Sequence, residues 1–387
     1  MKVGIVTHYF KSKNYGGNLQ AYALSQFINQ IGRYTSFQIS YDRRFDNVNR
    51  KNTKSKYLRK ICRFFLQGIK KLFTFFLWRK IRQRNLSFNY FNQNFIPHTK
   101  EVFTQKTINQ VNDEFDCFIV GSDQVWAPSA VCDFYLLKFA QKGKYKFSYA
   151  ASLACKYIDD EKKIMYANAL QNLNTISVRE ENGAEQIQSL TKIKVELVLD
   201  PTLLLSSEDW NKICPERRIK ENYVFCYFLG GIKKYRKTIK PYAKSKKLKI
   251  VTLPYLAGAI IGENFGDYRL FDISPADFIS LIKYADCVFT DSFHATVFSH
   301  IYRKDFFVFQ REGYKGMSDR IYSLTSLFDT QERFCDTREK ANINYVKNLK
   351  AIDYNRTFIK FEEMKEKSIK FLESNLLKAE QMLKNGQ

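Results

Sequence analysis

The chain has 387 residues and a formal net charge of +24, with 45% hydrophobic and 26% charged residues. This length exceeds one ordinary hydrophobic core and predicts two domains, while the hydrophobic content excludes a largely disordered chain. Every long apolar run is interrupted by Lys, Arg or Gln, and the N-terminus lacks a signal-peptide pattern, so we expect a cytoplasmic protein without a transmembrane helix.

The first elements along the chain alternate strand and helix. The run 2–7 (KVGIVT) is an apolar strand, NYGGN is a glycine loop, and 19–31 has helical spacing that Asn18 is expected to cap. This order is typical of a doubly wound α/β domain, in which glycines let backbone N–H groups approach an anion. Gly16, Gly17 and Asn18 are therefore candidate anion-binding residues, and a plain tight turn is the alternative interpretation.

A basic segment follows at about 47–100 and contains no Asp or Glu. Within it, residues 55–84 place apolar side chains at helical spacing beside Lys and Arg, which predicts a basic amphipathic helix or a helical pair. It could lie on an anionic membrane, at the inner face of the cytoplasmic membrane, or form a surface helix with a solvated basic face. No RNA-binding signature accompanies the charge, so nucleic acid is not a predicted partner.

The α/β alternation then continues to residue 205. Strands are expected at 115–120, 144–153, 175–180 and 194–200. Asp200-Pro201 ends the last strand, and we place the end of the first domain (1–205) there. Asp123 follows a strand as a candidate base or as a cap of the next element. Arg179 also follows a strand, where it would suit a bidentate grip on carboxylate or phosphate, or a structural salt bridge.

The second domain is predicted over 220–330, and 331–387 is predicted to be a helical tail. Strands are expected near 222–229, 248–254, 286–292 and 305–310, and helices at 233–246, 275–285 and 293–302. Ser274 with Asp277 has the capping-box pattern of a helix start. The cysteines lack the clustered spacing of a zinc site, so no metal is predicted.

His294 is one of four histidines in the chain and lies directly after a predicted strand, in the first turn of a helix. The positive end of the helix dipole disfavours the charged imidazole there, which would suit proton exchange near neutral pH. A structural histidine is the alternative. His300 lies off the same helix face and is interpreted as structural.

Five segments, in this order and spacing, resemble the polysaccharide pyruvyl transferase family. They are NYGGNLQAYAL, VGSDQVW, SVREENGAE, VLDPTLLL and TDSFHATVFSHIYRKDFFVF. The similarity covers about 1–330, and the basic insert resembles the variable insert of capsule-cluster members. The resemblance implies two Rossmann-like domains facing a cleft, as in GT-B glycosyltransferases.

The resemblance also implies a reaction. Phosphoenolpyruvate, as a substrate and not a bound cofactor, would donate a pyruvyl group to two hydroxyls of a sugar, giving a ketal and phosphate. The acceptor would be a sugar of a lipid-linked or polymeric envelope glycan, such as a capsular polysaccharide or exopolysaccharide. His294 matches the family's active-site histidine, a general acid/base, and Arg179 matches its donor-binding arginine.

One position departs from the family pattern. Many members have Arg-x-His where this chain has Ser292-Phe293-His294, so Ser292 stands in the place of a donor-binding arginine. The cation candidates that could replace it are Lys233, Lys234, Arg303 and Arg311. Two other functions stay open: a GT-B glycosyltransferase that uses a nucleotide sugar, and a non-catalytic glycan- or membrane-binding relative.

Overall fold

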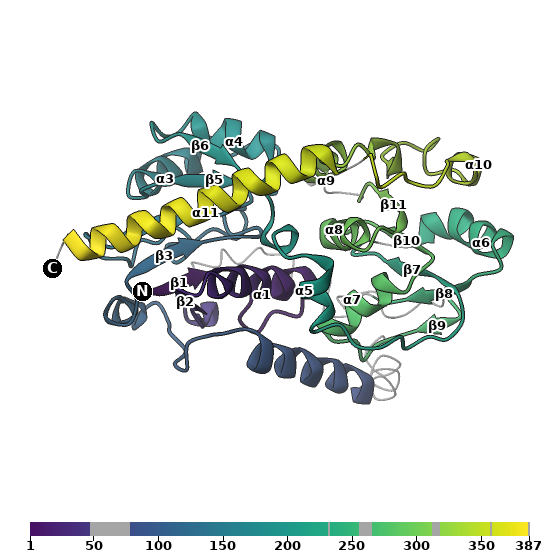
Figure 1. The fold of residues 1–387 in the computed structure, drawn as a ribbon, viewed down its shortest axis with the longest axis horizontal. Coiled ribbons are helices and arrows are strands. Elements are labelled where there is room, and N and C mark those ends of the chain that lie inside the picture. Colours follow the sequence, from purple (N-terminus) through teal and green to yellow (C-terminus); the bar gives the residue numbers. More distant parts are fainter. Residues whose placement is uncertain (47–77, 231–232, 255–264, 312–317, 357, 386–387) are drawn as a thin grey trace, which may run out of the picture.

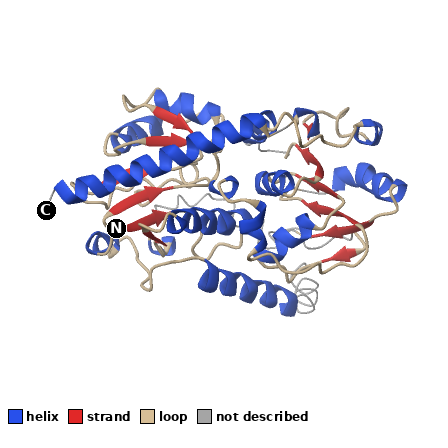
Figure 2. Cartoon of the chain, viewed as in Figure 1, coloured by secondary structure: helices blue, strands red, loops and turns tan. Residues whose placement is uncertain are grey.

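The computed structural model describes residues 1–46, 78–230, 233–254, 265–311, 318–356 and 358–385 of the chain. Within them the chain forms two α/β domains that lie side by side along the long axis of the molecule (Figure 1). Each domain is a parallel sheet with helices packed against it (Figure 2). The prediction of two doubly wound, Rossmann-like domains is confirmed.

The first domain is built on a parallel sheet with the spatial order β2-β1-β3-β4. The pair β5-β6 extends this sheet, because isolated bridges join Phe147 to Thr175 and Ala151 to Val178. β1 and β3 are neighbours, so the segments that follow them lie side by side. The strands are β1 (Lys2–Val6), β2 (Thr35–Gln38), β3 (Cys117–Val120), β4 (Tyr145–Ser148), β5 (Ile176–Val178) and β6 (Val195–Leu197).

The helices of this part of the chain include two that sequence analysis missed. They are α1 (Tyr15–Gln30), α3 (Asp160–Leu170), α4 (Glu181–Gln188) and α5 (Ser207–Asn211). The missed helices are α3 and α5. A further helix is described over 78–95, where it overlaps the end of the basic helix predicted at 55–84. Residues 55–77 of that prediction lie outside the described residues.

The second domain has the spatial strand order β12-β11-β10-β7-β8-β9. Numbered within the domain, this is the Rossmann order 6-5-4-1-2-3. The strands are β7 (Tyr223–Tyr227), β8 (Lys249–Thr252), β9 (Tyr268–Arg269), β10 (Cys287–Thr290), β11 (Asp305–Phe309) and β12 (Phe334–Cys335). β12 lies beyond the predicted domain limit of 330, because a two-residue strand gives no periodic sequence signal.

The helices of the second half are α6 (Arg236–Ser245), α7 (Pro275–Lys283), α8 (Phe293–Ile301), α9 (Ser318–Leu327), α10 (Ile343–Asn348) and α11 (Ile359–Asn385). The capping box predicted for Ser274 and Asp277 starts α7. Among the described residues, none of the helices combines the length and the apolar character that crossing a bilayer requires.

The long helix α11 crosses back from the second domain and packs on the first (Figure 1). Leu372, Leu376 and Ala379 are spaced on one helix face and are buried in a core that also holds residues of β1 and β4. The Tyr145 hydroxyl of β4 donates a hydrogen bond to Asn375 over 2.8 Å. The predicted tail is therefore part of the first domain's core.

Helix α1 also packs against the second domain. The ring of Tyr15 stacks on that of Phe278 of α7, with a centroid distance of 4.8 Å and an interplanar angle of 10°. The Tyr15 hydroxyl donates to the carbonyl of Ile273 over 3.1 Å. Because all these groups are buried, the domains share one continuous apolar core along α1, α7 and α8.

The start of α1 differs from the sequence prediction. Asn14, not Asn18, is the cap: its side-chain oxygen accepts from the Gly17 N–H over 3.3 Å. Gly16 and Gly17 are therefore in the first helical turn rather than in a loop. Asn18 is fully buried in that turn, and its amide donates to the Asn14 carbonyl. An asparagine at either position satisfies the N-cap preference, so sequence alone could not choose between them.

His300 has the structural role predicted for it. Its ring is fully buried and stacks on Phe328 with a centroid distance of 3.9 Å. Neither ring nitrogen has a hydrogen-bond partner among the described residues. Burial without a partner lowers the pKa of His300 from 6.5 to about 3, so the folded protein holds this imidazole neutral.

This burial predicts a pH-dependent stability. Below pH 6.5 the unfolded chain binds a proton at His300 that the folded chain cannot, so the free energy of unfolding falls as the pH falls. Between pH 7 and pH 5 the loss from this one group is about 2 kcal/mol. Urea unfolding of wild type and His300→Phe at both pH values measures it. The free energy of unfolding of the variant should fall by about 2 kcal/mol less between pH 7 and pH 5 than that of wild type. An equal fall in both proteins would contradict the assignment of His300 as a neutral buried imidazole.

Candidate functional site

A cavity of about 660 Å³ lies between the two domains and is called the cleft here. From the first domain it is lined by the segment after β1 and by the turn after β3. From the second it is lined by residues that follow β7 and β10. The carboxyl ends of the parallel strands thus face it, as expected of a ligand site in doubly wound folds. Ile81, Arg84 and Asn85 of the 78–95 helix complete the wall.

Basic side chains dominate the charge of the cleft. Among the described residues, the charged side chains that line it are the basic Lys13, Arg84, Arg311 and Arg320 and the acidic Asp123. Lys13 donates to the side chain of Asn89, and Arg311 pairs with Asp291 at 3.2 Å. A partly enclosed cavity lined mainly by one sign of charge raises the local concentration of ligands of the opposite sign. The cleft is therefore suited to an anionic ligand.

His294 enters the cleft from the first turn of α8 and lies against the first turn of α1. A Cβ atom placed on Gly16 would be 2.0 Å from His294 Nδ1, so only a glycine leaves room for the imidazole. Ser292 caps α8, its hydroxyl accepting from the Ala295 N–H over 3.4 Å. The position of the ring thus depends on both domains.

The other nitrogen of His294 faces a buried carboxylate of the first domain. His294 Nε2 is 3.7 Å from Asp200 Oδ2, which is too long for a hydrogen bond, and it has no other partner among the described residues. Asp200 caps the turn that follows β6, accepting from the N–H and the hydroxyl of Thr202. A carboxylate behind an imidazole can orient the ring.

Arg179 forms a buried ion cluster directly behind this pair. Its side chain is 1% exposed and contacts Asp200 at 2.5 Å, Asp123 at 3.3 Å and Glu180 at 3.4 Å. Burial acts to raise the pKa of Asp200, but His294 and Arg179 outweigh it and lower the pKa far below its usual range. The pKa of Glu180 is raised, since burial there outweighs Arg179 and the Ser152 hydroxyl that donates to it.

Asp123 joins this cluster to the cleft. Its φ of 65° lies in the left-handed region, which an aspartate adopts more readily than most residues. Its carbonyl accepts hydrogen bonds from Val125 and Ser152, which hold the turn. Burial acts to raise the pKa of Asp123, but Arg179 and His294 outweigh it and lower the pKa, so the side chain faces the cleft as a carboxylate.

Arg320 of α9 is a second buried guanidinium beside Arg179. With the Gln124 amide oriented so that its oxygen faces Arg320, the guanidinium donates to it over 2.8 and 3.3 Å, while Nε has no partner among the described residues. Burial and the nearby charge of Arg179 lower the pKa of Arg320 to about 10. Its charge is therefore incompletely balanced, and an anion bound in the cleft would stabilise it.

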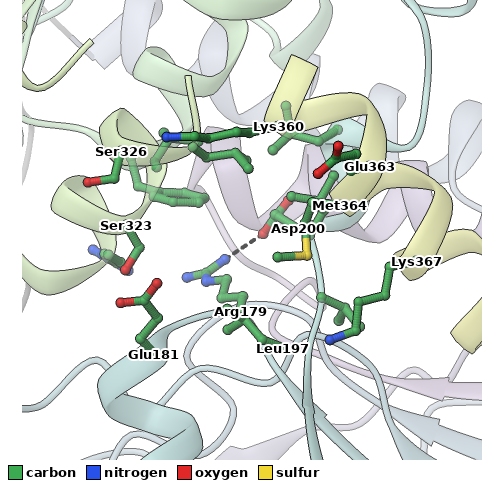
Figure 3. Close-up of a pocket in the computed structure, with 17 residues that line it drawn as sticks. Arg179, Glu181, Leu197, Asp200, Ser323, Ser326, Lys360, Glu363, Met364 and Lys367 are labelled. Carbon is green, nitrogen blue, oxygen red and sulfur yellow. Dashed lines mark hydrogen bonds and ion pairs between the residues drawn. The ribbon is translucent and has the colours of Figure 1, made fainter. Parts of the chain in front are cut away.

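A second cavity, of about 480 Å³, lies on the other side of this cluster (Figure 3). Arg179 and Asp200 form one wall, and Lys360, Glu363, Met364 and Lys367 of α11 line the opposite side. Phe293 and Arg320 line both cavities, and the Phe293 ring lies 4.6 Å from the Arg179 guanidinium and 5.8 Å from that of Arg320. These side chains separate the two cavities.

The sequence profile of the family described as Polysaccharide pyruvyl transferase matches residues 14–313. The chain belongs to this family. The match contains the cleft-lining residues from Asn14 to Arg311, including Asp123 and His294, while Ser12, Lys13 and Arg320 of the cleft lie outside it. A comparison with curated protein sequences finds no match. The family implies a sugar or polysaccharide acceptor and supports a transferase.

Solved structures support the GT-B-like fold of this pyruvyl transferase family member. MnaA from S. aureus, determined with UDP, is similar with a TM-score of 0.54 and 9% identity, covering 97% of this chain and 96% of its own. The UDP-GlcNAc 2-epimerase from Methanocaldococcus jannaschii, in complex with UDP-GlcNAc and UDP, has a TM-score of 0.50 and 11% identity, covering 97% and 100%. Identities this low show the fold alone.

Only some of the predicted site residues of this family member line the cleft. Asp123, Ser292 and His294 line the cleft. Gly16 lies beneath the His294 ring, and a Cβ on Gly17 would meet the His8 carbonyl at 2.9 Å, so both glycines permit close packing. Asn18 is buried in α1, and Arg179 lines the second cavity rather than the cleft. Whether these residues bind a donor stays a prediction.

The four predicted replacement cations are spread over the second domain. Arg311 lines the cleft. Arg303 lies over the ring of Phe358, and Lys234 lines a different cavity with Arg338. The side chain of Lys233 lies outside the described residues.

Sequence analysis missed several residues of the site. Asp200 was interpreted only as a strand end, and Arg320 has no motif around it. His8, two residues after β1, donates from Nε2 to the Gln124 carbonyl over 3.1 Å, and its Nδ1 lies 2.8 Å from the Tyr135 hydroxyl. Burial lowers its pKa. Because His8 lies close to the end of a predicted strand, its position in the sequence could have identified it.

Among the described residues, no group of three or more His, Cys, Asp or Glu side chains could hold a metal ion.

The contact between Gly16 and His294 predicts a strong and specific mutational effect. Gly16→Ala should lower the free energy of unfolding by about 1–3 kcal/mol, because the new methyl overlaps the imidazole. Urea unfolding measures the loss, and Gly183→Ala in α4 is the control, since the nearest atom to its Cβ is a carboxylate oxygen of Glu180 at 3.3 Å. Combining Gly16→Ala with His294→Ala should recover most of the loss. Strictly additive effects would show that the two residues do not touch.

Proposed function

We propose that this chain is a cytoplasmic transferase that moves a pyruvyl group from phosphoenolpyruvate to two hydroxyls of one sugar in an envelope glycan. The methylene carbon of the donor gains a proton and becomes a methyl group, while the first hydroxyl adds to the neighbouring carbon and gives up its proton, so the protons balance in this step. The second hydroxyl then bonds to that carbon, the carbon–oxygen bond to phosphate breaks, and the phosphate leaves with the second hydroxyl proton. No cofactor is needed to balance this reaction.

One observation carries the proposal: a histidine and a carboxylate share a cleft in which basic side chains outnumber acidic ones. The donor bears a carboxylate and a phosphate, so the cleft must supply cations. Its methylene must be protonated and the sugar hydroxyls must be deprotonated, so the cleft must also supply an acid and a base. Family membership supports the same reaction.

Roles for the two groups follow from their surroundings. The Nε2 atom of His294 lies 3.7 Å from the carboxylate of Asp200, which pairs with Arg179, so the imidazole is held between this carboxylate and the cleft. We assign His294 the proton transfer to and from the substrates. Asp123 faces the cleft as a carboxylate and is the second candidate base.

Arg320 is the best candidate for the cation that the missing Arg-x-His arginine would have supplied. It lines the cleft, is almost fully buried, and leaves Nε without a partner among the described residues. Arg179, the donor-binding residue implied by the family, is already surrounded by carboxylates, so contacting the donor would require it to exchange one of them. Ser292 is a further proposed donor contact through its hydroxyl.

The solved neighbours suggest the alternative that the cleft binds a nucleotide sugar. Both are described with UDP, and a phosphate-binding cleft would suit either donor. The cleft volume of about 660 Å³ exceeds what phosphoenolpyruvate needs and leaves room for a sugar in both cases.

Calorimetric titration distinguishes these donors. Phosphoenolpyruvate should bind, and Arg320→Ala should weaken binding by roughly 10- to 100-fold, because a hydrogen bond to a charged group contributes about 1.5–3 kcal/mol. Arg303→Ala removes a cation that lies outside the cleft and is the matched control. Weaker binding of phosphoenolpyruvate by Arg179→Ala would support a contact between Arg179 and the donor. Unchanged binding would show that Arg179 does not contact the donor. Binding of a nucleotide sugar with no response to phosphoenolpyruvate would overturn the proposal in favour of a glycosyltransferase.

Turnover tests the role of His294. His294→Gln should keep phosphoenolpyruvate binding within a few-fold of wild type and lose at least 100-fold in phosphate release, because general acid–base catalysis contributes about 10²–10⁴-fold. The assay measures phosphate released from phosphoenolpyruvate in the presence of envelope glycans from the source cells. Retained phosphate release would contradict the assignment of proton transfer to His294.

A further inference from the structure

The helix of residues 78–95, called the bridging helix here, has two chemically different faces. One face is internal: Phe88 and Phe91 are buried in the core, and Ile81, Arg84 and Asn85 line the cleft. The opposite face exposes large apolar side chains, since Trp78 is 54%, Leu86 57% and Tyr90 62% exposed. The bridging helix is the dark-blue helix along the lower edge of Figure 1, between the labelled elements and the edge of the molecule.

The spacing along the helix places exposed apolar residues and basic residues on the same face. Trp78, Arg82, Leu86 and Tyr90 follow one another at intervals of four, which puts them on one stripe of the helix. Arg79 is also exposed, and the Arg82 guanidinium lies 5.3 Å from the Trp78 ring. We call these five residues the outer stripe. The bridging helix contains no Asp or Glu that would balance this charge.

The bridging helix is held firmly on both domains. Arg84 lies 5.1 Å from the ring of Tyr15, and Lys13 donates to the side chain of Asn89 over 2.9 Å. At the other end Lys80 lies 5.6 Å from the ring of Phe271 in the second domain. Because the inner face is packed, the outer stripe is presented as a fixed surface rather than as a helix that must first detach.

We propose that the outer stripe docks on an anionic lipid bilayer and holds the cleft beside it. Tryptophan and tyrosine rings favour the water–bilayer interface, and arginines beside them are attracted to anionic headgroups. This combination of exposed aromatic, aliphatic and basic side chains on one helix face is that of an interfacial helix. Charge complementarity favours an anionic surface over a neutral one.

The geometry narrows the acceptor class, in an inference that rests on the proposed function. The inner face of the bridging helix lines the cleft and its outer stripe faces the bilayer, so about one helix diameter, roughly 10–12 Å, separates them. A glycan attached to a membrane lipid would reach the cleft with a sugar close to its lipid end.

Trp78 offers a selective probe for this docking. The chain has three tryptophans, and the other two, Trp126 and Trp210, are fully buried. Vesicles of phosphatidylcholine with phosphatidylglycerol should shift the protein's emission to the blue, and a brominated lipid should quench it. Vesicles of phosphatidylcholine alone should cause much smaller changes. Trp78→Phe should abolish both signals while the protein still sediments with anionic vesicles.

Charge variants test the same stripe without fluorescence. Arg79→Gln with Arg82→Gln should weaken sedimentation with anionic vesicles roughly 30-fold at low salt, since each basic residue near the surface contributes about 1 kcal/mol. Lys370→Gln with Lys384→Gln on α11 removes the same charge elsewhere and should change little. Both variants keep residues 47–77, so any binding by that segment is common to them.

Several results would overturn the proposal. An equal loss of vesicle binding in both pairs of variants would mean that net charge, not the outer stripe, controls the binding. Unchanged Trp78 emission in protein bound to vesicles would place the membrane contact elsewhere on the molecule. Binding of RNA with no binding of vesicles would assign the charge to nucleic acid. These measurements need no donor, so a protein that binds phosphoenolpyruvate but not vesicles would overturn this inference and leave the proposed function intact.

Discussion

Arg179 carries a full positive charge into the interior of the first domain, where its side chain is 1% exposed. An unpaired charge at that depth would cost several kcal/mol, and Asp123, Glu180 and Asp200 offset this cost from three neighbouring chain segments. Each of these carboxylates has a second contact: Asp123 lines the cleft, Glu180 accepts from Ser152, and Asp200 lies behind His294. One buried guanidinium therefore fixes the relative positions of the ends of β3, β5 and β6.

The second domain completes the arrangement. His294 is inserted between Asp200 and the first turn of α1, where Gly16 leaves room for it. His294, to which we assign proton transfer, thus belongs to one domain and Asp200, the carboxylate beside it, to the other. The stacked rings of Tyr15 and Phe278 hold the two domains in register, so the packing of the shared core also determines the geometry of the site.

Sequence reasoning recovered the strong periodic elements of this fold and the polar residues that follow the strand ends and line the cleft. The strands β1, β3, β7 and β10 were recognised because each is a short apolar run followed by glycine or a polar residue. Asp123 and His294 were found by that position alone. Arg320 and Asp200 were missed as site residues, since their importance arises from distant segments that meet in three dimensions. The choice of Asn14 over Asn18 as the cap likewise depends on where the helix begins, which propensity does not determine.

The path of α11 has a consequence for how the molecule is divided. The chain leaves the first domain near residue 205, builds the second, and returns to contribute Leu372, Leu376 and Ala379 to the first domain's core. The first domain is thus discontinuous in sequence, and the second is inserted between its two parts. A fragment ending at 205 would leave the apolar surface under α11 uncovered, and during synthesis on the ribosome the first domain must wait for α11 before its core is closed.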